Sequence, residues 1–74
     1  MVLACILVCC ESGKFREVMG ELRKVEGVKR AFGVHGRWDV IAEIKVADLK
    51  ALGEAVLKLH RLPGVRATET LISF

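Results

Sequence analysis

The sequence predicts a single α+β domain over residues 1–74, with its elements in the order βαββαβ. Three observations support this fold class. The chain opens with a short apolar segment typical of a strand, two later segments space their apolar residues by three and four as helices do, and the pattern repeats at an offset of 37 residues. A length of 74 residues leaves room for one domain.

The first half of the chain is predicted to hold a strand, a helix and a second strand. Residues 2–9 are all apolar and include β-branched side chains, which is typical of a strand buried on both faces. A helix follows, with Ser12 as its candidate N-cap and Gly27 as the residue that stops it. Residues 28–35 form the next strand. The apolar stripe of the helix comprises Phe15, Val18, Met19, Leu22 and Val25.

The second half repeats this arrangement. Residues 38–46 alternate between apolar and polar side chains, which predicts a strand with one buried face. Gly36 and Arg37 join it to the preceding strand as a short hairpin, where glycine suits a positive φ. Asp48 is the candidate N-cap of the second helix, and residues 65–74 form the last strand. The second helix has the stripe Leu49, Leu52, Val56, Leu59 and Leu62, and the buried face of the strand comprises Val40, Ala42, Ile44 and Val46.

The repeat identifies the architecture. At the offset of 37 residues Glu17 coincides with Glu54, and Gly27 coincides with Gly64. Two βαβ halves with right-handed crossovers build a four-stranded antiparallel sheet that carries both helices on one face. We therefore predict a ferredoxin-like βαββαβ sandwich.

The same offset assigns the two faces of the first strand. On this basis the helices cover Leu3, Cys5 and Leu7, and the open face of the sheet carries Val2, Ala4, Ile6 and Val8. Leaving large apolar side chains exposed forgoes about 1.5–3 kcal/mol each, and 53% of the chain is hydrophobic. We therefore expect a homodimer that packs through the open face of the sheet.

Composition and charge exclude several classes of protein. The net charge of +3 is spread along the chain and only four residues are aromatic, so we expect no direct contact with nucleic acid. No apolar run approaches the roughly 18 to 20 residues that span a bilayer, so we expect no membrane partner. Three cysteines, an odd number, favour free thiols in a reducing, cytoplasmic location.

The sequence contains no recognisable catalytic constellation, so we predict a protein that is not an enzyme and that uses no cofactor or metal. A soft-metal carrier using Cys9 and Cys10 is one alternative, because ferredoxin-like metallochaperones place two cysteines after the first strand. Their ligands are spaced CxxC, however, whereas adjacent cysteines on a strand point to opposite faces.

Polar residues cluster at the hairpin and on the last strand. Asp39 is suited to accept a hydrogen bond from an ammonium group, and Arg37 is suited to pair with a carboxylate. Thr68 and Thr70 share one face of the last strand, where each hydroxyl donates and accepts. The candidate ligand-binding residues are therefore His35, Gly36, Arg37, Trp38, Asp39, Thr68, Glu69 and Thr70.

Four motifs in this order resemble the effector-binding (RAM) domain of the Lrp/AsnC family of amino-acid-responsive regulators. They are Gly13-Lys14, the segment VEGV of residues 25–28, the segment VHGRWDV of residues 34–40 and the segment LPGVRATET of residues 62–70. Each motif is weak alone, but the four occur at the right spacing. The resemblance covers essentially the whole chain without insertions.

This resemblance implies a ferredoxin-like fold whose dimers pack sheet against sheet and assemble further into higher oligomers. It also implies that an amino-acid effector binds in a cleft between dimers. Gly36 and its neighbours would supply backbone groups there, Asp39 would be a polar anchor, and Thr68 and Thr70 would line the cleft.

The chain departs from the family pattern at three positions. His35 stands where the family commonly has Thr or Ser, Trp38 where it has Tyr or Phe, and Ser12 where proline is usual. Larger groups at positions 35 and 38 would shrink the pocket or change its ligand.

The role implied by the resemblance is regulatory. Because the chain begins at the first strand, we expect the stand-alone form, which lacks the N-terminal helix-turn-helix domain of the full-length regulators. It would act as an amino-acid sensor, or as a partner that co-assembles with a full-length Lrp/AsnC regulator. A further alternative is an ACT-like regulatory subunit of a metabolic enzyme, whose sheets join edge to edge rather than face to face.

Overall fold

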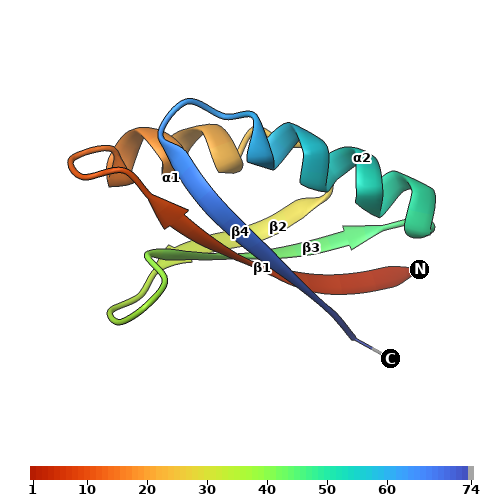
Figure 1. Cartoon of the computed structure of the whole chain (residues 1–74). Helices are drawn as coiled ribbons and strands as arrows, with labels where there is room; N and C mark the ends of the chain where they lie inside the picture. The colour runs from red at the N-terminus through yellow and green to blue at the C-terminus, as the bar shows by residue number, and fades with distance from the viewer. Residues whose placement is uncertain (74) are drawn as a thin grey trace.

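The computed structural model of the chain describes residues 1–73, and its element order is the predicted βαββαβ (Figure 1). Phe74, which the sequence assigns to the last strand, lies outside the described residues. The elements are β1 (Val2–Cys10), α1 (Phe15–Leu22), β2 (Val28–Gly33), β3 (Val40–Val46), α2 (Leu49–His60) and β4 (Val65–Ser73).

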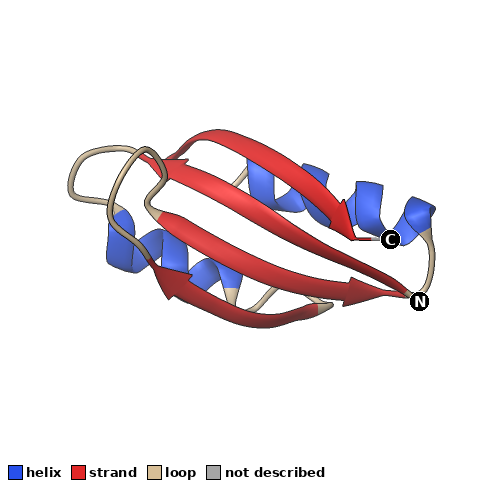
Figure 2. Ribbon diagram, turned by 90° about the horizontal axis from the view of Figure 1, so that it is seen from below, coloured by secondary structure: helices blue, strands red, loops and turns tan. Residues whose placement is uncertain are grey.

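The four strands form one sheet in the order β2-β3-β1-β4, and every neighbouring pair is antiparallel. Both helices lie on the same face of this sheet (Figure 1). Figure 2 looks onto the opposite face, where the strands lie in front and both helices behind them. The predicted ferredoxin-like architecture is confirmed.

The core lies between the sheet and the helices. The two central strands supply most of it, because Val8 pairs with Val40, Ile6 with Ala42 and Ala4 with Ile44, so these side chains share the helix-covered face. Leu22 from α1 and Leu59 from α2 are fully buried against them. Within residues 1–73 the buried residues are Ala4, Ile6, Val8, Cys10, Val18, Leu22, Ala31, Val40, Ala42, Ile44, Leu52, Ala55 and Leu59.

The predicted assignment of the β1 faces is wrong. Ile6 and Val8, expected on the open face, are fully buried under the helices, whereas Leu3, expected under the helices, is 50% exposed. The offset of 37 aligns buried Val18 and Leu22 of α1 with buried Ala55 and Leu59 of α2. It does not align the faces of β1 and β3, because the buried residues are even-numbered in both strands. A shift of one residue moves every side chain of a strand to the other face. The open face of β1 therefore carries Leu3, Cys5, Leu7 and Cys9.

The helices differ from the prediction mainly at their ends. Asp48 caps α2 as expected, because its Oδ1 accepts a hydrogen bond from the Ala51 backbone N–H at 2.8 Å. The N-cap of α1 is Lys14 rather than Ser12, and its side chain makes no capping hydrogen bond. The α-helix ends at Leu22, after which tighter turns carry the chain through Val25.

One face of α2 also differs from the predicted stripe. Leu49 is 63% exposed, and Ala55 is buried between Leu52 and Leu59 instead. In residues 1–73 neither helix has the length and apolar character needed to cross a membrane.

Candidate functional site

The candidate hairpin joins β2 to β3 at one end of the sheet. The Val34 N–H donates to the Asp39 carbonyl oxygen at 2.9 Å, which closes the hairpin at its base. Gly36 has a φ of +124°, the positive value expected for it, and open space surrounds it. His35, Gly36 and Arg37 are exposed at the tip. The hairpin thus presents backbone groups and the guanidinium of Arg37 to a ligand or partner at this end of the molecule.

Asp39 ties the hairpin to the end of β1. Its Oδ2 accepts a hydrogen bond from the Cys10 backbone N–H at 2.7 Å, and its own N–H donates to the Val8 carbonyl oxygen at 2.9 Å. The sequence suggested this carboxylate as an acceptor for an ammonium group, and the structure gives one of its two oxygens to the backbone. Asp39 is therefore part of what positions the hairpin.

The thiol of Cys10 lies on the helix-covered face beside this carboxylate. Burial raises the pKa of the Cys10 thiol, and the negative charge of Asp39 and the neighbouring Cys9 raise it further. Cys10 is buried whereas Cys9 is half-buried, so the two thiols point to opposite faces of β1, as predicted. In the described part of the chain no three His, Cys, Asp or Glu side chains gather in a way that could hold a metal ion.

The candidate residues of β4 lie on the other side of β1. Thr68 pairs with Val8 and Thr70 with Ile6, which places both threonines on the helix-covered side at the sheet edge. Their predicted common face is thereby confirmed. Glu69 pairs with Leu7 and belongs to the open face. The hairpin and β4 are thus two strand spacings apart, about 10 Å, with the end of β1 between them.

None of the eight candidate residues lines any of three hollows found in residues 1–73, whose volumes are about 450, 450 and 580 Å³. The structure therefore brings Asp39 close to the end of β1 and leaves the rest as two separate groups, in which Trp38, Thr68 and Thr70 are half-buried and the others exposed.

The open face of the sheet exposes several apolar side chains beside its charged ones. Side chains from all four strands form an apolar stripe across it. The sequence predicted an apolar open face for β1 but not the apolar side chains that the other three strands add. Leu3 and Leu71 are 50% and 51% exposed there. The alternation of residues 38–46 could have indicated one further member, Ile41, on the polar face of that strand. The stripe comprises Phe32, Ile41, Leu3, Cys5, Leu7 and Leu71.

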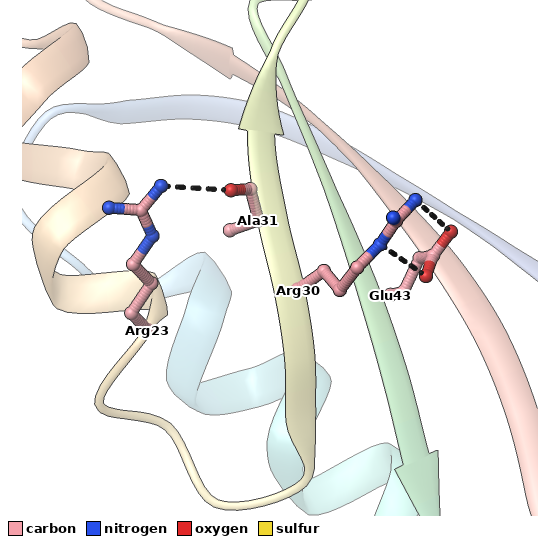
Figure 3. Close-up of polar contacts among 4 residues, drawn as sticks. All are labelled: Arg23, Arg30, Ala31 and Glu43. Carbon is pink, nitrogen blue, oxygen red and sulfur yellow. Dashed lines mark hydrogen bonds and ion pairs between the residues drawn. The ribbon is translucent and has the colours of Figure 1, made fainter.

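A charged pair borders this stripe on β2 and β3. Arg30 donates to both carboxylate oxygens of Glu43, at 3.0 and 3.2 Å (Figure 3), and its guanidinium carbon lies 5.1 Å from the ring centre of Phe32. Both partners are well exposed to solvent, so the pair adds little to the stability of one chain. It does fix two long side chains at the rim of the apolar stripe.

The β2 edge of the sheet is partly blocked. Arg23, just after α1, donates from Nη2 to the Ala31 carbonyl oxygen at 3.1 Å (Figure 3). A bulge also interrupts β2, because Val28 and Arg30 pair with the adjacent residues Ile44 and Glu43 and leave Lys29 unpaired. Occupied carbonyls and bulges are features that hinder the addition of another strand to a sheet edge.

Comparison with known proteins gives matches over the whole chain. The family profile of the Lrp/AsnC ligand binding domain matches residues 3–74. The HTH-type transcriptional regulator FL11 of Pyrococcus abyssi is 30% identical over 71 residues, which cover 96% of this chain and 47% of that protein. The uncharacterized HTH-type transcriptional regulator PF0250 of Pyrococcus furiosus is 33% identical over 60 residues, or 80% of this chain and 40% of that protein. The chain thus spans less than half the length of these curated relatives.

Solved structures agree with the fold. FFRP-DM1 superposes with a TM-score of 0.95 at 36% identity, with 100% of both chains covered. The hypothetical protein PHS023 from Pyrococcus horikoshii gives a TM-score of 0.92 at 36% identity, covering 100% of this chain and 90% of that one. The transcriptional regulator NMB0573 of Neisseria meningitidis, solved as a complex with L-Met, gives 0.87 at 24% identity over 99% of this chain and 49% of that one, a likeness of fold alone.

Proposed function

Because the chain belongs to the Lrp/AsnC ligand-binding domain family, we propose that it is an amino-acid-binding regulatory module and not an enzyme. The observation that carries this proposal is the family match over residues 3–74 together with the exposed glycine hairpin, which presents backbone groups and a guanidinium side by side. The matched relatives are named as helix-turn-helix (HTH-type) transcriptional regulators. The module would therefore act in transcriptional regulation, either as a cytoplasmic sensor or by co-assembling with a full-length regulator.

The hairpin and β4 supply the chemistry that an amino acid needs. Arg37 would pair with the carboxylate of the effector, and the second oxygen of Asp39 would accept from its ammonium group. Thr68 and Thr70 would add hydroxyls, and Glu69 a second carboxylate, while His35 and Trp38 would set which side chain fits. None of these groups lines the three hollows described above for residues 1–73, and a second copy would complete the cleft.

Assembly would use the open face of the sheet. Two copies packed face to face would bury the apolar stripe of both, which favours association by about 25 cal/mol per Å² of apolar surface removed from water. The β2 edge is the less suitable surface, since Arg23 occupies the Ala31 carbonyl there. These features favour face-to-face packing over the edge-to-edge joining of an ACT-like subunit. The same face would receive the matching domain of a full-length regulator.

Thermal unfolding of the purified protein in the presence of each of the twenty amino acids tests the effector role. A ligand present at a hundred times its dissociation constant adds about 2.7 kcal/mol to the free energy of unfolding, which raises the Tm clearly. We expect one or a few amino acids to do so, and Arg37→Gln to abolish the rise. Arg16→Gln, an equal change of charge at an exposed position of α1, should preserve it.

The result that would refute the effector role is a Tm unchanged by all twenty amino acids. Co-assembly would then remain as the regulatory role, and mixing with a full-length regulator would test it.

A further inference from the structure

The hairpin and the loop of residues 11–14, which joins β1 to α1, lie at the same end of the sheet, on the left of Figures 1 and 2. Cys10, the residue before this loop, donates its N–H to Asp39 on the β3 side of the hairpin. Phe15, the residue after the loop, lies against Gly33, the last residue of β2. The two ends of one loop therefore hold the two sides of the hairpin.

The tip of the Phe15 ring occupies the space that a side chain at Gly33 would take. A Cβ at Gly33 would lie 2.9 Å from Phe15 Cε1 and nearer still to Cζ. The φ of Gly33 is not positive, so the ring rather than the backbone conformation requires glycine there. Gly33 pairs with buried Val40, which places the ring on the helix-covered face of the sheet.

The β2 side of the hairpin is the less restrained side. β2 is an edge strand, so β3 alone flanks it within the sheet. Among residues 1–73 one side-chain hydrogen bond involves residues 33–39, and it is the bond from Cys10 to Asp39 on the β3 side. The Phe15 ring, itself 38% exposed, supplies on the β2 side the restraint that the carboxylate supplies on the β3 side.

The same loop also contacts the residue that precedes β4. The Glu11 N–H donates to the Gly64 carbonyl oxygen at 2.7 Å. A Cβ at Gly64 would lie 2.9 Å from Lys14 Cβ, so the loop packs closely against this turn. Residues 10–15 thus connect the hairpin to the start of β4, and with it the two groups of candidate residues that the sheet holds apart.

We propose that Phe15 is a positioning residue for the hairpin, and that it acts through its contact with Gly33. Groups that bind a ligand have to be held within about 0.5 Å of their productive geometry by the residues that support them. Phe15 does this for the backbone groups of the hairpin and for Arg37, without touching the effector itself. The inference rests on the proposed role of the hairpin as an effector site.

Amide hydrogen exchange of the ligand-free protein tests the positioning without an effector. The N–H groups of Val34 and Asp39 each donate at 2.9 Å when the hairpin is in place, so their exchange reports its local opening. Phe15→Ala should speed their exchange about tenfold relative to the amides of β1. Met19→Ala is the matched control, because Met19 is half-buried one turn further along α1. It should leave that ratio unchanged.

An exchange ratio unchanged by Phe15→Ala would overturn the proposal, and so would an equal rise with Met19→Ala.

A double-mutant cycle tests the contact itself. Gly33→Ala should destabilise the wild-type protein, because the new Cβ collides with the ring. In the Phe15→Ala protein the same change should be neutral or stabilising, since the space is free and glycine is unfavourable inside a strand. Urea unfolding of the four proteins measures the difference. The same effect of Gly33→Ala in both backgrounds would overturn the proposal.

Titration calorimetry with the twenty amino acids connects the positioning to the proposed function. For an amino acid that binds the wild-type protein, Phe15→Ala should raise the Kd about tenfold, and Met19→Ala should leave it unchanged. A Kd unchanged by Phe15→Ala would overturn the role of Phe15 at the effector site. If none of the twenty binds, the proposed effector role fails, and the exchange of Val34 and Asp39 still decides whether Phe15 positions the hairpin.

Discussion

Asp39 and Cys10 are joined by a hydrogen bond of 2.7 Å from the Cys10 backbone N–H to the Asp39 carboxylate, across the ends of two neighbouring strands. This contact fastens the base of the hairpin to β1. A carboxylate that accepts from a partly buried backbone N–H contributes more than a neutral acceptor would. Asp39 therefore has a structural role whether or not it also touches an effector.

Asp39→Ala should lower the free energy of unfolding by about 1–3 kcal/mol, because it leaves the Cys10 N–H without its acceptor. Asp39→Asn should recover part of the loss, since an amide oxygen still accepts. Urea unfolding at neutral pH measures both changes. Asp48→Asn is the matched control and should be nearly neutral, because asparagine caps a helix as well as aspartate does. An unchanged unfolding midpoint for Asp39→Ala would contradict the structural role.

The Cys10 thiol makes stability depend on alkaline pH. Burial, Asp39 and Cys9 raise its pKa in the folded state above the ordinary 9.0. The folded chain then holds this proton more tightly than the unfolded chain, so the contribution to stability is complete below about pH 9 and is lost as the pH rises through the raised pKa.

Wild-type protein should therefore lose more stability than Cys10→Ala between about pH 8 and about pH 10. Urea unfolding at the two pH values gives the difference for each protein, which removes the direct effect of the substitution. Equal losses in the two proteins would show that the thiol proton is not held more tightly in the folded state.

Gly27 occupies a position where any residue with a Cβ atom would be strained. Its φ is +97°, and an added Cβ would lie 2.8 Å from Val46 Cγ1. Gly27→Ala should therefore destabilise the fold by about 1–2 kcal/mol from its backbone conformation alone. Gly53→Ala should instead stabilise it by about 0.5–1 kcal/mol, because Gly53 is inside α2 with open space around it. Thermal unfolding of the two variants checks the prediction, and a Gly27→Ala variant as stable as Gly53→Ala would refute it.

The sequence was sufficient for the fold but not for the faces of β1. The alternation of β3 distinguishes buried Ala42 from half-buried Ile41, because Ile41 shares its face with the polar residues at positions 39, 43 and 45. Residues 2–9 have no polar member, so periodicity alone cannot orient that strand. The assignment then depended on the repeat. The offset of 37, which holds for the helices, is odd, whereas the buried residues of β1 and β3 lie an even number of positions apart, so the two faces of β1 were exchanged.

The candidate site was predictable in its backbone and less so in its side chains. The positive φ of Gly36 and the common face of Thr68 and Thr70 follow from local rules of turns and strands. The use of Asp39 by the Cys10 N–H depends on residues 29 positions apart in sequence, and no local pattern reveals such a contact. The ligand role of these residues remains a prediction.

The solution mass of the protein tests most directly the claim that the open face is an assembly surface. Leu71 and Leu57 are 51% and 55% exposed, but Leu71 lies on the open face and Leu57 on α2. Sedimentation equilibrium should give wild-type protein and Leu57→Glu at least twice the chain mass of 8.2 kDa. Leu71→Glu should sediment as a folded monomer, because it places a charge within the apolar stripe. A monomeric wild-type protein, or a Leu71→Glu variant that keeps the wild-type mass, would contradict the account.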